Sequence, residues 1–246
     1  MSEGRIATFL NWNIERRAPH TRQTAILIQR AVAQRPDVIC LTEAHEGSTA
    51  ALGGHEIGDR GATWSNNRRN GERLALLWSP SPWRDVDADG NGGTSTGGYV
   101  SGTTDTPIGP IRIVGICAPH HAASQVGADQ KARLWTEQVA FWNGLAKLIA
   151  ARDHSIPTVL LGDFNQYVPR IWGSKAAHAA MLAALDDLSL ATGGPITGID
   201  KPTIDHVAHT PDLAPQTVIG LSRFDDDGRA LSDHFGVLVR FAPTAG

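Results

Sequence analysis

The sequence predicts a layered α/β protein in which helices cover strands that are buried on both sides. The chain has 246 residues, of which 41% are apolar, and this is enough for a substantial core. Strand-like apolar runs recur along it, and several are too continuous for a sheet face that is open to water. Helical patterns lie between these runs, and strands with peripheral helices form layers. We expect a single domain over residues 1–246.

The expected elements follow one another along the whole chain. The strand-like runs are IATFLNWNI (6–14), DVICLTEA (37–44), ERLALLW (72–78), IRIVGICA (111–118), TVLLGDFN (158–165), TIDHVAH (203–209) and FGVLVRFA (235–242). Helical patterns cover Thr21 to Gln34, about Ala128 to Arg152, and Ser174 to Leu188, where Ser174 is a suitable N-cap. The stretch from Asp87 to Gly109 is poor in apolar residues and rich in Gly, Thr and Asp, so it predicts a loop or a long hairpin tip.

The bulk charge and the absence of long apolar runs limit the partners of the chain. Its formal net charge is −3, and it contains no block of Lys or Arg that would clamp nucleic acid by charge alone. An acidic phosphodiesterase remains compatible, because a bound divalent cation supplies positive charge where the phosphate sits. No apolar run reaches the length of a membrane span, and the first residues lack a secretory pattern. We therefore expect a cytoplasmic monomer with no membrane partner.

The two cysteines predict no chemistry of their own. Cys40 and Cys117 each lie within an apolar, β-branched run and have no CxxC partner. This is typical of reduced thiols in a protein core rather than of a redox or zinc pair.

The stretch LLGDFNQ (160–166) places a carboxylate and an amide just beyond a buried run. In a strand, side chains alternate between faces, so Asp163 and Asn165 would point the same way and Phe164 would point into the core. Gly, Asp and Asn also favour turns, so this stretch alone leaves a plain chain reversal open. Other segments have to decide between the two interpretations.

Similar polar residues follow or interrupt several of the strand-like runs. Asn13 follows FLNW, Glu43 follows VICLT, Asp205 and His206 lie within TIDHV, and Asp233 with His234 precedes FGVLV. Carboxylate and amide oxygens from separate segments are typical ligands of Mg²⁺ or Mn²⁺. The pattern therefore predicts one open site for Mg²⁺ or Mn²⁺.

Taken together, these segments resemble the endonuclease/exonuclease/phosphatase superfamily over nearly the whole chain. Five of its elements appear in family order, namely NWNI, LTEA, LLGDFN, TIDHV and LSDHFGV. The resemblance implies a four-layer α/β/β/α sandwich, in which two mixed β-sheets pack face to face with helices outside. It also implies a metal-dependent phosphoesterase whose site lies at one edge of the sandwich.

The resemblance further implies a role for each residue. Glu43, helped by Asn13 and Asp233, would hold the divalent ion, which neutralises the phosphate and stabilises the departing oxygen. Asp163 would orient and deprotonate the attacking water for in-line hydrolysis, and Asn165 would fix the phosphate or that carboxylate. Asp205 would keep His234 protonated beside the phosphate.

A second histidine and its partner are less uniquely placed by the resemblance. The run ending ICAPHH offers His120 or His121, of which we prefer His120. GERLALLW resembles the deoxyribonuclease branch, where a glutamate opening this strand pairs with the second histidine, so Glu72 is its candidate partner. A surface glutamate that caps a strand is the alternative.

The substrate we expect is a phosphoester, and a nucleic acid is preferred. Side chains near the expected site that could contact phosphates are Arg16, Arg17, Arg68 and Arg69, although exposed arginine pairs are usually plain solvated surface. Trp64 and Trp172 could stack on a base or fill the core, whereas Trp12 is expected in the core. The insertion from 87 to 109 lacks the apolar tip that a lipid hydrolase would need. A small-molecule phosphoesterase and a non-catalytic binding module on the same fold are the alternatives.

A serine hydrolase is a further rival, because GTSTG (93–97) satisfies the G-x-S-x-G pattern. That pattern requires a buried strand before Ser95 and a helix after it, and the sequence predicts neither.

Overall fold

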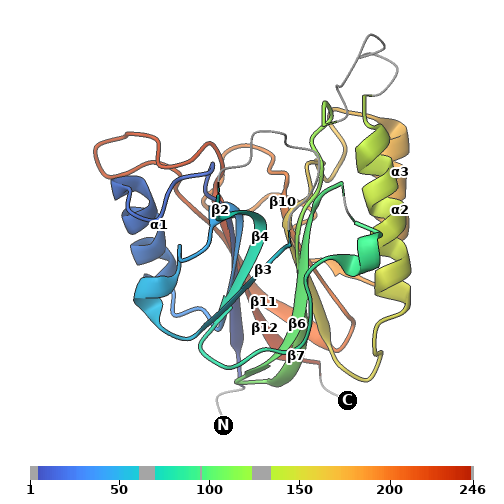
Figure 1. The fold of residues 1–246 in the computed structure, drawn as a ribbon, viewed down its shortest axis with the longest axis horizontal. Helices are drawn as coiled ribbons and strands as arrows, with labels where there is room; N and C mark the ends of the chain where they lie inside the picture. Colours follow the sequence, from blue (N-terminus) through green and yellow to red (C-terminus); the bar gives the residue numbers. More distant parts are fainter. Residues whose placement is uncertain (1–4, 61–69, 95, 124–133, 245–246) are drawn as a thin grey trace.

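Two six-stranded sheets pack face to face at the centre of the fold (Figure 1). The structure is a computed structural model, and it describes residues 5–60, 70–94, 96–123 and 134–244. The first sheet contains, in spatial order, β11 (Leu213–Leu221), β12 (Gly236–Pro243), β1 (Ala7–Asn13), β2 (Val38–His45), β4 (Glu72–Ser79) and β3 (His55–Gly58). The second contains β5 (Arg84–Asp87), β6 (Gly98–Thr106), β7 (Gly109–Cys117), β8 (Thr158–Asp163), β10 (Asp205–His209) and β9 (Ser189–Leu190). Both sheets are mixed, because β1 with β2 and β7 with β8 are parallel pairs while the other pairs are antiparallel.

Helices cover the two outer faces and complete four layers, so the predicted sandwich is confirmed. Figure 1 shows α1 (Arg22–Ala33) outside the first sheet and α2 (Thr136–Ala150) with α3 (Lys175–Ala184) outside the second. The side chain of Thr21 caps α1 by accepting a hydrogen bond from Thr24 N. Ser174 caps α3 by accepting from Ala177 N, which confirms the predicted N-cap. Within the described part of the chain, no helix is both long enough and apolar enough to cross a membrane.

Two helix boundaries differ from the prediction. The helix α2 begins at Thr136, and most of the earlier part of the predicted range lies outside the described residues. The helix α3 ends at Ala184 rather than at Leu188. Leu185 and Leu188 nevertheless stay buried in the cluster beneath α2 and α3, which explains why the apolar pattern continued beyond the helix.

The strand β1 shows how alternation separates the cores. Phe9 packs between the two sheets, whereas Leu10 and Trp12 pack on the other side against α1. Trp12 is fully buried, as predicted, and Cys40 and Cys117 are buried free thiols. The same alternation turns Asn11 and Asn13 of β1 toward the second sheet.

The prediction of a loop or long hairpin tip from Asp87 to Gly109 is wrong over most of its second half. The strand β6 occupies nine of these residues and pairs along its whole length with β7. Its glycines allow close packing, since a Cβ atom on Gly98 would lie 2.5 Å from the Leu74 Cβ atom. Its hydroxyl groups are paired inside the fold, for example Tyr99 with Ser101 at 2.9 Å. A strand built from small and polar residues leaves little apolar periodicity in the sequence.

Candidate active site

The polar residues predicted from separate segments meet at one edge of the sandwich. Two of these residues are neighbours in the register of the second sheet. Asp163 of β8 pairs with Asp205 of β10 on one side and with Cys117 of β7 on the other. Asn13 ends β1 and pairs in register with Thr42, the residue before Glu43. Both sheets therefore contribute side chains to the same edge.

Asn13 connects the two carboxylates that belong to different sheets. Its Nδ2 lies 3.3 Å from Glu43 Oε1 and 3.2 Å from Asp163 Oδ2. Its Oδ1 accepts a hydrogen bond of 2.9 Å from Glu15 N, so this amide would have to turn before its oxygen could face an ion. The Asn13 amide thus sets the separation of Glu43 and Asp163 in the present arrangement.

Glu43 occupies an unusual backbone position within β2. Its φ is +47°, a left-handed value that costs on the order of 1–3 kcal/mol for a residue other than glycine. Arg16 lies nearby, with its Nε 3.7 Å from Glu43 Oε2 and its backbone N–H bonded to Glu43 O at 2.7 Å. The strand is bent here, so the side chain leaves the regular alternation of β2 and reaches the site.

The GDFN stretch is both a strand end and a turn. Asp163 Oδ1 accepts a hydrogen bond of 2.9 Å from Asn165 N, which is the pattern of an Asx-turn. Asn165 has φ +50° and donates from Nδ2 to the carbonyl of Ala118 at 2.8 Å. The two interpretations that the sequence left open are therefore compatible, because the turn brings Asn165 beside Asp163.

A buried polar network that sequence reasoning missed holds this turn. Gln138 of α2 donates from Nε2 to Asn165 O at 3.1 Å, and Gln166 donates to Gln138 Oε1 at 2.6 Å. His206 Nε2 donates to Gln166 O at 3.0 Å while its Nδ1 bonds with the Thr192 hydroxyl at 3.0 Å. Burial lowers the pKa of His206 to about 4, so the ring is neutral and suits these two roles. The contacts join segments far apart in sequence, so no local sequence pattern indicated them.

Asp205 and His234 form a short side-chain contact at this edge. His234 Nδ1 lies 2.6 Å from Asp205 Oδ2, and Asn11 donates to the other oxygen, Oδ1, at 3.3 Å. Burial by itself lowers the pKa of His234, but Asp205, followed by Asp163 and Asp233, outweighs it and raises that pKa to about 10. The imidazole is therefore cationic at neutral pH.

The backbone around His234 is tied directly to β1. The Ser232 hydroxyl donates to Asn13 O at 2.6 Å and accepts from His234 N at 3.1 Å. Trp12 Nε1 donates to His234 O at 3.1 Å. The segments that carry Asn13 and His234 are therefore held together by hydrogen bonds to their backbone atoms.

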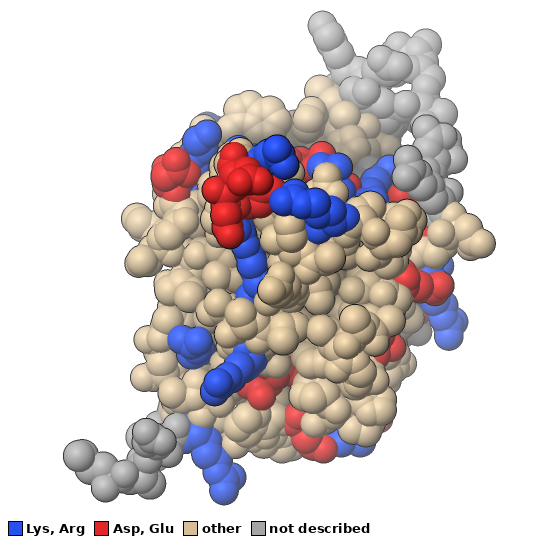
Figure 2. All heavy atoms as spheres, turned by 90° about the vertical axis from the view of Figure 1, so that its left-hand side faces the viewer, with Lys and Arg blue, Asp and Glu red and all other residues tan. Residues whose placement is uncertain are grey.

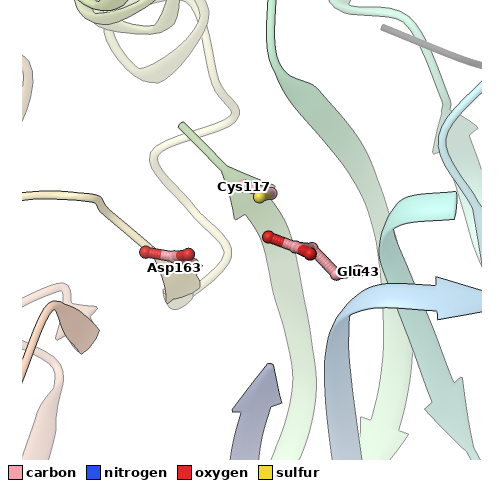
Figure 3. Close-up of side chains that lie close together, drawn as sticks. All are labelled: Glu43, Cys117 and Asp163. Atoms are coloured by element: carbon pink, nitrogen blue, oxygen red, sulfur yellow. The ribbon is translucent and has the colours of Figure 1, made fainter. Parts of the chain in front are cut away.

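Glu43, Asp163 and Cys117 offer candidate ligand atoms within 4.8 Å of one another (Figure 3). Burial raises the pKa of the Glu43 carboxyl, and burial likewise raises the pKa of the Asp163 carboxyl despite the opposing charge of His234. Burial and the neighbouring carboxylates raise the pKa of Cys117 well above its ordinary value, so its thiol stays protonated. Carboxylate oxygens are thus the effective donors, and a hard divalent cation would relieve their crowding. The residues fit such an ion.

The remaining predicted residues are Asp233, His120 and Glu72. The Asp233 side chain is 62% exposed, with its Oδ1 3.8 Å from His234 Nε2. His120 Nδ1 accepts a hydrogen bond of 3.1 Å from Ala122 N, and the buried Glu72 lies 4.0 Å from His45 Nε2. The pairing of Glu72 with His120 stays a prediction.

Several predicted residues lie outside the described part of the chain. These are Trp64, Arg68, Arg69 and Ser95. The element that follows Ser95 is β6, so the helix required after a serine-hydrolase nucleophile is a strand here.

The outer face that carries α1 has charges of both signs. Figure 2 shows acidic and basic side chains gathered together near one edge of this face. Two of the ion pairs that α1 makes are Arg22 with Asp225 at 2.8 Å and Arg30 with Asp226 at 2.7 Å. Such pairing leaves no continuous basic surface among the described residues of this face.

Comparison with known proteins identifies the family. The model of the Endonuclease/Exonuclease/phosphatase family matches residues 10–234, and the chain therefore belongs to this family of phosphoesterases. No curated protein matches the chain.

Solved structures of the same fold are similar over almost all of this chain. An endonuclease/exonuclease/phosphatase from Beutenbergia cavernae DSM 12333 is 20% identical with a TM-score of 0.66, covering 97% of this chain and 72% of its own. D. rerio TDP2 complexed with single-strand DNA product is 10% identical with a TM-score of 0.69, covering 96% and 98%. An AP endonuclease from Archaeoglobus fulgidus is 12% identical with a TM-score of 0.68, covering 97% and 100%. At these identities the likeness concerns the fold.

The contact between Asp205 and His234 leads to a direct prediction. In Asp205→Asn the carboxylate charge is lost, so the pKa of His234 should fall from about 10 toward its ordinary value. An NMR titration of the His234 ring protons measures this, and the His209 ring, which bonds to Thr210 O, serves as an internal reference. In a kinetic double-mutant cycle, Asp205→Asn and His234→Ala should cost little more together than the larger single loss. A double mutant that shows the full product of both losses would refute the coupling.

Proposed function

We propose that the protein is a Mg²⁺- or Mn²⁺-dependent phosphodiester hydrolase that acts on nucleic acid. The observation that carries the proposal is the convergence of the partly buried Glu43 and the buried Asp163 with the His234 imidazolium, which Asp205 holds, at one edge of the fold. A site that combines clustered oxygen ligands, a candidate base and a fixed cation suits the hydrolysis of an anionic ester.

In this proposal Glu43 holds the divalent ion together with Asn13 and Asp233. A bound divalent cation supplies positive charge that offsets the phosphoryl oxygens and the departing oxygen. Before the ion binds, the Asn13 amide donates to one oxygen of the Glu43 carboxylate, and Arg16 Nε lies 3.7 Å from the other oxygen. The backbone geometry of Glu43 keeps this carboxylate at the site edge.

Asp163 takes the proton from the attacking water, and Asn165 orients that carboxylate. The hydrogen bond from Asn165 N to Asp163 Oδ1 leaves Asp163 Oδ2 facing Asn13 and the site. Because burial raises the pKa of Asp163, this carboxylate is a better proton acceptor than an exposed aspartate. The His234 imidazolium lies on the same edge and stabilises the negative charge of the phosphoryl group during in-line attack.

Nucleic acid is the substrate class that the surroundings of the site favour. Arg16 and Arg17 have side chains that are 33% and 32% exposed, so they can reach a phosphate beside the scissile one. Trp172 is 56% exposed, and exposed aromatic rings stack on bases. D. rerio TDP2, which has the same fold, is complexed with single-strand DNA product, and this supports the choice. With a net charge of −3 the binding should be weak and salt-dependent.

A substrate panel tests the proposal. Purified protein with Mg²⁺ or Mn²⁺ should cleave at least one of single-stranded DNA, duplex DNA, abasic duplex or RNA, and EDTA should stop the cleavage. Inositol phosphates and sphingomyelin serve as comparison substrates of other classes. Efficient hydrolysis of a soluble phosphoester, with every nucleic acid left intact, would contradict the nuclease assignment and favour a small-molecule phosphoesterase.

A further inference from the structure

Three aromatic rings from separate segments pack together beside the candidate site. The Trp172 ring lies 5.2 Å from the Trp135 ring and 5.4 Å from the His121 ring, centroid to centroid. Trp135 and His121 also contact each other, with centroids 5.5 Å apart. Trp172 is nevertheless 56% exposed, and His121 is also exposed. A large ring held by two others and still open to water is available for a flat ligand.

The local backbone is built around these rings. Trp135 stands at the N-cap of α2 with φ +70° and makes no side-chain cap, although small polar residues are preferred at this position. Its backbone N–H donates to His121 O at 2.9 Å, which joins two of the three segments. Gly173, with φ +94°, leaves room for the third contact, because a Cβ atom there would lie 2.8 Å from the Trp135 ring. The requirements of helix capping do not explain a tryptophan here, whereas the ring cluster does.

The cluster is continuous with the candidate active site. The hydrogen bond from Asn165 Nδ2 to Ala118 O fixes the two segments that lead to Trp172 and to His121 respectively. The His121 ring lies 5.9 Å from the ring of His120, and burial, followed by the nearby charges of His121 and Arg16, lowers the pKa of His120. Arg16 in turn contacts Glu43 at 3.7 Å. The ring cluster is therefore linked to the Glu43 side of the site through His120 and Arg16.

We infer that His121, Trp135 and Trp172 form a stacking platform for a nucleobase next to the scissile phosphate. This inference rests on the proposed hydrolase function and adds a means of recognising the substrate. A base is flat and presents a π-face whatever its sequence, and stacking on an exposed indole contributes about 1–3 kcal/mol per base. The exposed Arg170, which bonds to Gly173 O at 2.9 Å, lies in the same loop and suits the phosphate that follows the base.

A membrane surface is the other partner that an exposed tryptophan could meet. Ile171 is 60% exposed and adjoins Trp172, so insertion into lipid would use both side chains. Stacking on a base would use Trp172 and not Ile171. The pair of neighbours therefore provides a matched comparison of two side chains that are similarly exposed.

The kinetic test compares two esters that release the same p-nitrophenolate. Thymidine 5′-(p-nitrophenyl phosphate) carries a base, whereas methyl p-nitrophenyl phosphate does not. Trp172→Ala should raise KM for the thymidine ester about tenfold or more and leave the rate on the methyl ester unchanged. Trp172→Phe should bring the KM for the thymidine ester most of the way back to the wild-type value, and Ile171→Ala should have the wild-type KM. Equal effects of Trp172→Ala on both esters, or no effect on either, would overturn the inference.

A binding measurement tests the stacking platform independently of catalytic turnover. Fluorescence anisotropy of a labelled eight-residue oligothymidylate should show weaker binding to Trp172→Ala, while an abasic oligomer of the same length should bind equally to wild type and variant. If neither ester is hydrolysed but this difference holds, the hydrolase proposal fails and the platform stands. If Trp172→Ala and Ile171→Ala both abolish sedimentation with phosphatidylcholine vesicles and leave oligonucleotide binding unchanged, the surface binds lipid and the inference is wrong.

Discussion

Replacing Asp163 with asparagine is expected to lower kcat by about 10²- to 10⁴-fold, the range typical of a lost general base. The substitution hardly changes the size of a fully buried side chain, and one oxygen remains to accept the hydrogen bond from Asn165 N. What disappears is the ability to accept a proton from water in the buried setting that raises the pKa of this carboxyl. KM should change little, because the proposed ion ligand Glu43 and the cationic His234 stay in place.

The control for this variant is the same chemical change at an exposed aspartate. Asp105 pairs with Arg84 at 2.8 Å on the surface, so Asp105→Asn should leave kcat within twofold of wild type. Circular dichroism and thermal unfolding of both variants check that the fold survives. If Asp163→Asn retains activity within a few-fold of wild type, the GDFN segment is only a turn.

The layers and the chain order of the site were predictable because β1, β2 and β8 are buried on both faces. Such strands appear as continuous apolar runs, and the first polar residue after each run falls at the sheet edge. Asn13, Glu43 and Asp163 were found in this way, and the structure brings their side chains together. The strand β6 escaped prediction because its buried residues include glycine, serine and threonine.

The hydrogen bonds and backbone conformations that hold the site residues in place were less predictable, because they depend on contacts between distant segments of the chain. Gln138 and His206 carry no local pattern that points to Asn165 and Gln166, since their partners come from other elements. The left-handed backbone at Glu43 is equally hidden, since glutamate has no preference for that conformation. The Gln138 and His206 network and the Glu43 backbone conformation depend on strand register and on hydrogen bonds between distant segments.

Removal of divalent ions is expected to abolish turnover completely. The carboxylates of the partly buried Glu43 and the buried Asp163 lie close together, and the described part of the cluster offers oxygen ligands rather than an ionised thiol. Without a cation the phosphoryl group would meet this negative charge directly. Protein treated exhaustively with EDTA should be inactive on bis-p-nitrophenyl phosphate, and Mg²⁺ or Mn²⁺ should restore the rate.

Glu43→Gln separates loss of the ion from general damage to the site. The variant removes one ligand charge and should need at least tenfold more Mn²⁺ for half-maximal activity. Glu46 is three residues away and pairs with Arg73 on the surface, so Glu46→Gln is the matched control and should titrate as wild type.

The most direct measurement is a Mn²⁺ titration followed by the electron paramagnetic resonance signal of the free aqua ion. It detects binding whether or not the enzyme turns over. We predict saturable binding to wild type and Glu46→Gln, markedly weaker binding to Glu43→Gln, and a parallel dependence of hydrolysis on bound Mn²⁺. Full activity of the metal-free protein, or Mn²⁺ binding that is unchanged in Glu43→Gln, would contradict the account.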